Sequence, residues 1–298
     1  MNWENERQKR IEELENIIRA YLPAEEGYQK RVIEAMNYSI LAGGKRIRPM
    51  LMLETYRLFG GKDKIIEPFL AAIEMIHTYS LVHDDLPAMD DDEYRRGRKT
   101  THIVYGEAMA ILAGDGLLNL AFETACRAFD MEPHHPHIGR ALQILAGKAG
   151  IYGMIGGQTA DIQAEGMKQD EVTEELLLFI HEHKTAALIQ EAMMIGALLA
   201  KAEENRLEAV EKIARNIGVA FQIQDDILDI TGSLEVLGKT AGSDRKNDKV
   251  TYVTLKGMEQ AKKDVENLSA EAITLLESFE EKNEYLNQLI SYLIHREK

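Results

Sequence analysis

The stretch FLAAIEMIHTYSLVHDDLPAMDDD, residues 69–92, passes from an apolar run into five aspartates within nine positions. Its first half, FLAAIEMIHTYSLVH, has the apolar spacing that is typical of a helix. Adjacent carboxylates repel one another, and burying any of them without a partner is costly. The aspartates are therefore either solvated by water or bound by something strongly positive.

The aspartates at the end of this helix cannot share one face of an uninterrupted helix. Each residue turns ~100°, so six positions place Asp90 on the wrong side relative to Asp84. Pro87 breaks the helix between them, and we therefore expect residues 86–89 to bulge and to return Asp90 beside Asp84. Carboxylates at one cavity mouth suit Mg²⁺, a hard cation that is commonly shared with substrate phosphates.

A second acidic cluster, FQIQDDILD, occupies residues 221–229. On a helix, Asp225 and Asp229 are stacked neighbours with Asp226 beside them, and Gln222 joins the same stripe. Apolar residues surround the cluster, which is unusual for a solvated acidic face. Either cluster alone could be solvated surface. Both together, in apolar helical context, favour a metal site.

Basic residues complement the aspartates. GGKRIRP, residues 43–49, places Lys45 and Arg48 just before a predicted helix, where free backbone N–H groups also favour an anion. Arg95 and Arg96 follow the first aspartate cluster, and their planar fork suits bidentate phosphate binding. His77 lies seven residues before Asp84, on the same helix face. Taken alone, His77 would more often be a core histidine and the arginine pair solvated surface.

The rest of the chain predicts one large all-α domain, residues 1–298. Six prolines in 298 residues leave long segments free to be helical. The net charge of −15 argues against a nucleic-acid surface, and the single cysteine, Cys126, excludes a disulfide framework. The N-terminus lacks a signal-peptide core, and no apolar run approaches the ~18 residues of a membrane span. We therefore expect a cytoplasmic protein without a membrane span.

These motifs together resemble bacterial trans-prenyl diphosphate synthases, and among them the farnesyl diphosphate synthases (geranyltranstransferases). Seven segments match in family order between residues 43 and 244. They are GGKRIRP, EMIHTYSLVHDDLPAMDDDEYRRG, YGEAMAILAGDGLL, GGQTADI, HKTAALI, FQIQDDILD and LGKTAGSD.

The resemblance implies an antiparallel helical bundle around a deep central cavity, of the isoprenoid synthase type, usually as a homodimer. It implies a prenyltransferase that condenses isopentenyl diphosphate head to tail with dimethylallyl and then geranyl diphosphate to give farnesyl diphosphate. About three Mg²⁺ ions, which Mn²⁺ can replace, would assist ionisation of the allylic diphosphate. No further cofactor is implied.

The resemblance also assigns roles to residues. The implied metal ligands are Asp84 and Asp90 on one cavity wall and Asp225 on the other, with Asp85, Asp226 and Asp229 in supporting positions. The implied isopentenyl diphosphate ligands are Lys45, Arg48, His77 and Arg96. The implied allylic diphosphate ligands are Arg95, Lys184 and Lys239, with Thr185 and Gln222 along the reacting carbons. The residues implied to act in the reaction itself are Lys184, Thr185, Gln222, Asp84 and Asp225.

The resemblance assigns control of product length to two adjacent residues. The family stops chain growth with an aromatic residue five positions before its first aspartate, which is Tyr79 here, with Ser80 next to it. Helical arithmetic places Ser80 on the face of Asp84 but turns Tyr79 ~140° away. A tyrosine packed between helices is the alternative. Two other positions, Lys99 and Val253, depart from prolines common in the family, and Arg296 weakly matches a C-terminal arginine.

Other functions remain open from the sequence. A geranylgeranyl diphosphate synthase has the same motifs and a longer product. A terpene cyclase shares an aspartate-rich motif but needs no second diphosphate site, so GGKRIRP counts against it. A non-catalytic subunit of a heteromeric prenyl synthase would lose ligands that are present here. An acidic helical scaffold would explain the aspartates but not the arginines.

Overall fold

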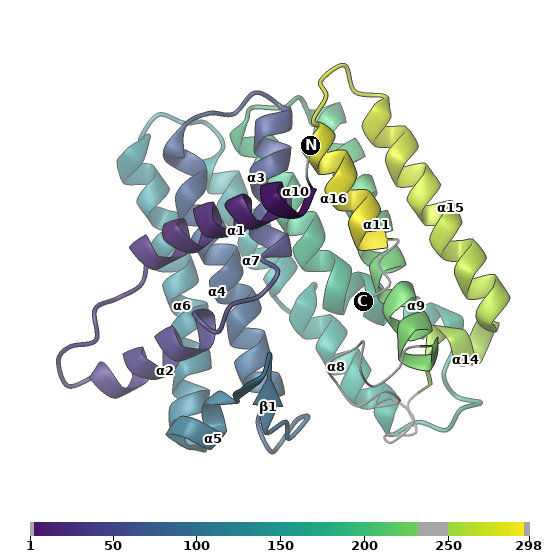
Figure 1. Ribbon diagram of the computed structural model, residues 1–298, viewed down its shortest axis with the longest axis horizontal. Coiled ribbons are helices and arrows are strands. Elements are labelled where there is room, and N and C mark those ends of the chain that lie inside the picture. The colour runs from purple at the N-terminus through teal and green to yellow at the C-terminus, as the bar shows by residue number, and fades with distance from the viewer. Residues whose placement is uncertain (1–2, 232–249, 295–298) are drawn as a thin grey trace. The chain divides into compact units, whose positions relative to one another are not determined.

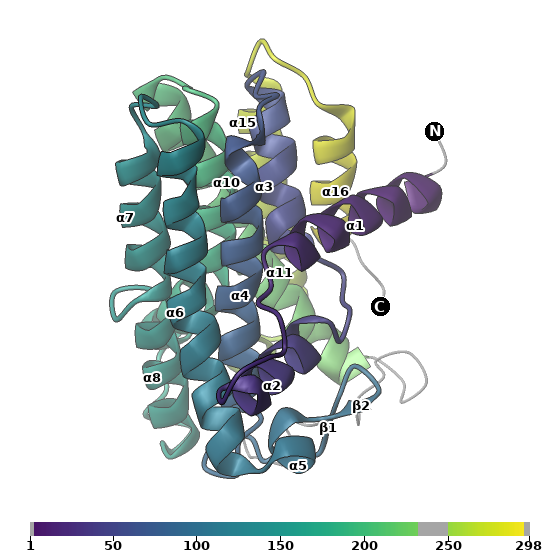
Figure 2. The same cartoon turned by 90° about the vertical axis from the view of Figure 1, so that its left-hand side faces the viewer.

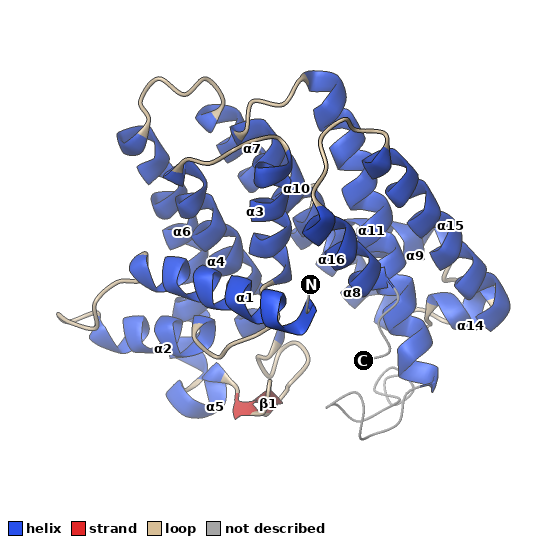
Figure 3. Cartoon of the chain, turned by 45° about the horizontal axis from the view of Figure 1, so that its top comes forward, coloured by secondary structure: helices blue, strands red, loops and turns tan. Residues whose placement is uncertain are grey.

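The computed structural model describes residues 3–231 and 250–294, and over these ranges it is built of helices and one two-stranded hairpin, β1 (Tyr94–Arg95) with β2 (Arg98–Lys99). Figure 3 shows the helices in blue and the hairpin in red. The predicted all-α class is confirmed. The contacts between residues divide the chain into two compact units: unit 1 holds residues 1–53 and 62–142, and unit 2 holds residues 54–61 and 143–298. That the whole chain is one domain stays a prediction.

Helix α4 (Glu67–Asp84) is the main buried helix of unit 1. It packs against α1 (Trp3–Ala20), α2 (Lys30–Ile40) and α6 (Glu107–Met131), and Figures 1 and 2 both show it alongside α6. Pro68 lies in its first turn, where a missing N–H costs nothing. Most of its residues are buried, as expected for a helix that is apolar on all sides. Helix α4 therefore carries the first aspartate cluster out of a packed core.

The other elements of unit 1 are shorter. They are η1 (Lys64–Ile66) and α5 (Thr101–Tyr105), together with parts of α3 (Ile47–Leu58) and α7 (Ile138–Ala149), which contribute residues to both units.

Helix α10 (Ala187–Leu199) forms the core of unit 2, and all of its residues are buried. It packs against α11 (Glu204–Thr231), and α15 (Met258–Glu277) lies along α11 in turn (Figure 1). The remaining elements are α8 (Met154–Glu165), α9 (Glu174–Ile180), the π-helix η2 (His181–Ala186), α14 (Tyr252–Lys256) and α16 (Glu284–Ile294). The second aspartate cluster thus lies on the last turns of the long helix α11.

Two helical segments, Lys64–Asp84 and Glu107–Met131, are long and apolar enough to cross a membrane by length and composition. The expectation that no apolar run approaches this length was therefore too strict. In the first segment 78% of the apolar window is buried inside the structure, and in the second 39%. Core helices of soluble proteins meet the same criteria, because a helix buried on all sides needs no polar face.

Candidate active site

The first aspartate cluster begins where α4 ends, and it has the bulge predicted from Pro87. The backbone N–H of Asp90 donates to the carbonyl of Asp84 at 2.9 Å, and that of Asp91 donates to the carbonyl of Leu86 at 3.2 Å. Asp90 therefore lies beside Asp84 although six residues separate them. Asp84 is half-buried and Asp90 is exposed, so both can meet a cation from solvent.

Asp85 has a different environment from its neighbours. It is 4% exposed, and its Oδ1 accepts a hydrogen bond from Nε of Arg95 at 2.5 Å. Burial raises the pKa of Asp85 above its usual value, although the Arg95 charge opposes this. A second contact, 3.5 Å from Nη2 of Arg95 to Asp92, holds the same guanidinium. Asp85 therefore orients Arg95, the predicted allylic diphosphate ligand.

The loop that carries Lys45 adopts an unusual backbone. Gly43 and Gly44 have φ angles of 80° and 140°, a region that glycine enters without strain. Arg96 donates a hydrogen bond to the carbonyl of Gly43, and a Cβ added at Gly44 would lie 2.6 Å from Nη1 of Arg96. The paired glycines of GGKRIRP thus make room for Arg96. Lys45, the next residue, is exposed.

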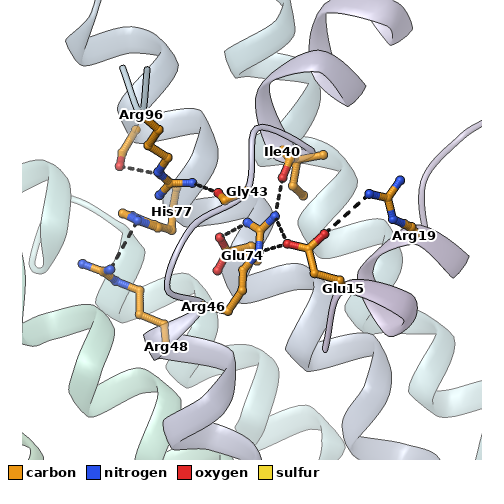
Figure 4. A network of polar contacts seen from close by, with 10 residues as sticks. Glu15, Arg19, Ile40, Gly43, Arg46, Arg48, Glu74, His77 and Arg96 are labelled. Carbon is orange, nitrogen blue, oxygen red and sulfur yellow. Dashed lines mark hydrogen bonds and ion pairs between the residues drawn. The ribbon is translucent and has the colours of Figure 1, made fainter. Parts of the chain in front are cut away.

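Arg48 and His77 meet in the same part of unit 1 (Figure 4). Nη1 of Arg48 lies 3.3 Å from Nε2 of His77. Burial, and next the charges of Arg48 and Arg96, hold the pKa of His77 well below its usual value, so the ring is neutral at pH 7. A guanidinium can only donate, so Nε2 of His77 accepts and Nδ1 carries the proton. The structure therefore groups Arg48 with His77 and places Arg96 against the loop of Lys45.

The two predicted chain-length residues occupy different surroundings on α4. Ser80 donates its hydroxyl to the carbonyl of His77 at 2.9 Å, within the helix. Tyr79 is 5% exposed, and its ring centroid lies 5.8 Å from that of His83, edge to face. His83 in turn lies 3.1 Å from the carbonyl of Ile111 on α6. Tyr79 therefore belongs to the side of α4 that includes the α6 contact, consistent with its helical angle from Asp84.

In unit 2, two glycines let neighbouring helices approach the π-helix η2 closely. A Cβ at Gly157 on α8 would lie 2.6 Å from the backbone carbon of His183 and 2.7 Å from Cα of Lys184. A Cβ at Gly218 on α11 would lie 2.5 Å from Cα of Ala186. Backbone atoms cannot give way as a flexible side chain can. The segment HEHKTA is thus held between α8 and α11, and π-helical turns of this kind occur frequently at functional sites.

Each predicted site residue of η2 has a partner on one of these two helices. Nζ of Lys184 donates to Oδ2 of Asp161 on α8 at 2.5 Å, and Asp161 is 3% exposed. The hydroxyl of Thr185 donates to Oε1 of Gln222 on α11 at 2.8 Å. A fixed buried carboxylate therefore holds the lysine, and the threonine and glutamine are joined directly.

The second aspartate cluster, like the first, contains one buried aspartate beside others that are more exposed. Asp226 is 6% exposed, and its Oδ2 accepts from the backbone N–H of Tyr252 at 2.9 Å and lies 3.6 Å from Nε2 of His181. Asp225 and Asp229 are half-buried on the same helix. Asp226 therefore connects α11, η2 and α14 within unit 2. Asp225 and Asp229 are the members better placed to hold a cation.

The donor set suits a hard divalent cation. Within residues 3–231 and 250–294, no group of three or more His, Cys, Asp or Glu is arranged to hold a metal ion by itself. Asp84, Asp90, Asp225 and Asp229 nevertheless supply carboxylate oxygens, the ligands that Mg²⁺ prefers. Mg²⁺ commonly takes only one or two carboxylates and completes its shell with water and substrate phosphate. Asp84 and Asp90 in unit 1 therefore fit such an ion, and Asp225 and Asp229 in unit 2 do so independently.

Two residues named from the sequence lie outside the described part of the chain, and several buried polar residues of the two units were not predicted. Lys239 and Arg296 fall outside the described residues. Sequence reasoning missed His181, and it left the role of Asp161 open although Asp161 follows Gly157 by one helical turn. It also missed Arg46, which lies inside GGKRIRP but is buried and bonded to Glu15 and Glu74.

Comparison with known proteins gives one family. The polyprenyl synthetase model matches residues 29–293. A farnesyl diphosphate synthase of Micrococcus luteus is 43% identical over 285 residues, 95% of this chain and 94% of its own length. The large subunit 1 of a heterodimeric chloroplastic geranylgeranyl pyrophosphate synthase of Arabidopsis thaliana is 44% identical over 269 residues, 90% of this chain and 72% of its own length.

Solved structures agree with the sequence comparison. An apo FPP/GFPP synthase from Zymomonas mobilis matches with a TM-score of 0.86 and 32% identity, covering 98% of this chain and 99% of that chain. A geranyltransferase from Legionella pneumophila matches with a TM-score of 0.85 and 32% identity, covering 99% and 97%. The names of these similar proteins all describe prenyl transfer, but they give different products.

Proposed function

The chain belongs to the polyprenyl synthetase family and is a prenyltransferase, and from this we propose that it condenses isopentenyl diphosphate with dimethylallyl and then geranyl diphosphate to give farnesyl diphosphate. One observation carries the proposal. Arg95 and Arg96 are adjacent in sequence but are held by different partners, Asp85 and the carbonyl of Gly43. Two separately held cations suit two diphosphate groups, and a condensation of two diphosphates needs both.

The proposed reaction begins when the allylic carbon–oxygen bond breaks and its electron pair leaves with the diphosphate. The proposed ligands of that leaving group are Arg95 of unit 1 and Lys184 of unit 2, each bonded to a buried aspartate, and Lys239, which lies outside the described residues. Each 1.36 kcal/mol removed from the barrier gives tenfold in rate, so several fixed charges act multiplicatively. The hydroxyl of Thr185 donates a hydrogen bond to Oε1 of Gln222, which leaves the lone pairs of the Thr185 oxygen available to the allylic cation.

The second half of the reaction joins the two substrates. The isopentenyl double bond attacks the allylic cation, a new carbon–carbon bond forms, and a proton is lost to the departing diphosphate. Lys45, Arg48, His77 and Arg96 hold isopentenyl diphosphate during this step. Before substrate binds His77 is neutral at pH 7, because burial and the charges of Arg48 and Arg96 lower its pKa, and we assign it the role of a hydrogen-bonding group.

The proposed metal is Mg²⁺, about three ions, with Mn²⁺ as a substitute. The proposed direct ligands are Asp84, Asp90, Asp225 and Asp229. Asp85 and Asp226 would support these ligands through their contacts within the chain. When bound, the ions neutralise the charge of the diphosphate and so make it a better leaving group.

Farnesyl diphosphate is proposed as the product, and geranylgeranyl diphosphate is the second candidate. The Micrococcus relative supports the first, and the Arabidopsis relative supports the second. The aromatic Tyr79 favours the shorter product, because a ring occupies the volume that a further five-carbon unit needs. Incubation with labelled isopentenyl diphosphate, dimethylallyl diphosphate and Mg²⁺, followed by chromatography, distinguishes the two. Recovery of both substrates unchanged would reject prenyl transfer itself.

Tyr79→Ala is expected to lengthen the product to twenty carbons or more, since it removes the ring while leaving α4 helical. Tyr28→Ala is the matched control, because Tyr28 is fully exposed and belongs to the same unit. Product chain length is read by chromatography after hydrolysis of the diphosphate. A Tyr79→Ala variant with the parental product would assign length control to another residue.

Arg48→Ala and Lys184→Ala are expected to impair different substrates. Loss of a charged hydrogen-bond partner costs roughly tenfold to hundredfold in affinity. The KM for isopentenyl diphosphate should rise by this factor in Arg48→Ala, and the KM for geranyl diphosphate in Lys184→Ala. Exposed Lys62 provides the control, Lys62→Ala, with both KM values retained. Equal changes in both KM values would show that the residues are assigned to the wrong sites.

We further propose a homodimer located in the cytoplasm. Helices α5 and α6 of unit 1 expose large apolar side chains, among them Ile103, Ile111 and Leu112, which are 41%, 45% and 49% exposed. Clustered exposed apolar residues commonly mark protein–protein contacts. The charge of −15 favours a protein that stays in solution rather than at an anionic membrane surface.

A further inference from the structure

Arg46 differs from the other basic residues of GGKRIRP. Lys45 is exposed and Arg48 is half-buried, whereas Arg46 is 2% exposed. Its backbone has a φ of 47°, in the left-handed region that non-glycine residues rarely adopt. In this backbone conformation the Arg46 side chain is buried within unit 1. Strained residues of this kind persist only where the surroundings hold them.

Three partners hold the Arg46 guanidinium (Figure 4). Nε donates to Oε1 of Glu15 at 2.7 Å, Nη1 to Oε1 of Glu74 at 2.5 Å, and Nη2 to the carbonyl of Ile40 at 2.7 Å. Burial alone would lower the pKa of Arg46, but Glu74 and Glu15 outweigh it and raise the pKa above its usual value. Arg46 is therefore a charged, buried group with three bonded partners.

These partners come from three different helices. Glu74 lies on α4, one turn before His77, and Ile40 is the last residue of α2. Glu15 lies on α1, whose residues 3–20 precede the family match at 29–293. Arg46 thus joins the loop of Lys45 to the helix of His77 and to an N-terminal helix outside the matched region.

We propose that Arg46, held by Glu74 and by Glu15 of helix α1, is a positioning residue for the isopentenyl diphosphate ligands. The inference rests on the proposed function, because it takes Lys45, Arg48 and His77 as those ligands. Lys45 and Arg48 are one and two residues from Arg46, so a shift of Arg46 moves both relative to His77. Helix α1 is on this inference part of the substrate-binding apparatus.

The physical reason is the geometry of the guanidinium. Its planar fork donates in three directions at once, and the ammonium group of a lysine cannot reproduce this. Removing one carboxylate leaves a buried charge incompletely compensated, and the loop relaxes to restore hydration. Arg95 has separate partners, Asp85 and Asp92, so the allylic diphosphate ligand is not joined to this cluster directly.

The test compares Arg46→Lys, Glu15→Gln and the control Arg19→Gln. Arg19 contacts the same Glu15 at 3.7 Å but is 55% exposed and has no contact with Arg46 among the described interactions. A misplacement of a binding group by about 1 Å can cost up to roughly hundredfold, so the KM for isopentenyl diphosphate should rise roughly tenfold to hundredfold in Arg46→Lys and about threefold to tenfold in Glu15→Gln. The KM for geranyl diphosphate should change less than about threefold, since among the described contacts Arg95 and Lys184 share no partner with Arg46.

Calorimetric titration with isopentenyl diphosphate and thermal unfolding complete the test. Glu15 lies at a half-buried position, so Glu15→Gln is the variant that keeps the fold if Arg46→Lys does not. The positioning role is overturned, and the proposed function kept, if the parental protein binds and converts isopentenyl diphosphate but the variants show only a lower unfolding temperature. The same holds if the variants change both KM values equally. A parental protein that neither binds nor converts isopentenyl diphosphate overturns both.

Discussion

Replacing either Asp84 or Asp225 by alanine is expected to lower turnover by roughly 10³-fold or more, because each change removes a carboxylate that would hold the metal at the leaving diphosphate. The two residues come from different units, Asp84 from the end of α4 and Asp225 from α11. Both substitutions should leave the unfolding temperature close to that of the parent, since neither residue is fully buried. The measurement is the initial rate of isopentenyl diphosphate incorporation at saturating Mg²⁺.

The matched control is Asp130→Ala, which removes an exposed aspartate near the end of α6 and should retain the parental rate. Excess EDTA should abolish the parental activity, and added Mg²⁺ should restore it. Circular dichroism checks that each variant keeps its helices. Near-parental turnover of Asp84→Ala or Asp225→Ala, or a parental enzyme that tolerates EDTA, would refute the metal assignment.

The part of the site that follows from local chemistry was predictable from the sequence. Pro87 cannot donate a backbone hydrogen bond, so the chain had to leave the helix between Asp84 and Asp90, and the observed Asp90 N–H to Asp84 carbonyl bond is the predicted return. The rotation about the helix axis between Tyr79 and Asp84 likewise follows from the residue spacing alone. In both cases residues a few positions apart determine the geometry.

The part that depends on partners far apart in sequence was not predictable. The sequence assigns no role to Arg46 between Lys45 and Arg48, and only the approach of Glu15 and Glu74 from other helices shows that its side chain is buried and paired. The π-helical turn at residues 181–186 is similarly hidden, because the apolar pattern of ordinary helix continues on its C-terminal side. A sequence pattern shows which face of a helix is apolar. It does not show which charged side chain a different helix places against that face.

Asp85 and Asp226 show the same limit within the acidic clusters. Each is next to a candidate metal ligand, and adjacent aspartates look equivalent in the sequence. In the structure Asp85 is bonded to Arg95, and Asp226 is bonded to the backbone of Tyr252. One aspartate of each DD pair is therefore almost fully buried, whereas its neighbour is half-buried. We propose that the buried member supports and the half-buried member binds the cation, a division that only packing determines.

The second large effect is expected from Gly157→Ala, a change of one methyl group. The new Cβ would overlap backbone atoms of His183 and Lys184, so α8 must move away from η2. Overpacking of this kind costs about 1–3 kcal/mol, which corresponds to an unfolding temperature lower by roughly 3–10 °C. Asp161 lies one turn further along α8 and moves with it, so Lys184 loses its carboxylate. We expect turnover to fall by roughly hundredfold, with a higher KM for geranyl diphosphate.

Two further variants separate the causes of the Gly157→Ala effect. Gly147→Ala on α7 has open space around the new methyl group and should be neutral or slightly stabilising, because alanine is the better helix former. Asp161→Asn removes the charge that holds Lys184 without any overlap, so it should raise the KM for geranyl diphosphate while Gly157 keeps α8 against η2. If Gly157→Ala unfolds at the parental temperature, α8 is not packed against η2 as described. If Asp161→Asn leaves the KM for geranyl diphosphate unchanged, the buried carboxylate stabilises the fold, and Lys184 needs no support from it to bind diphosphate.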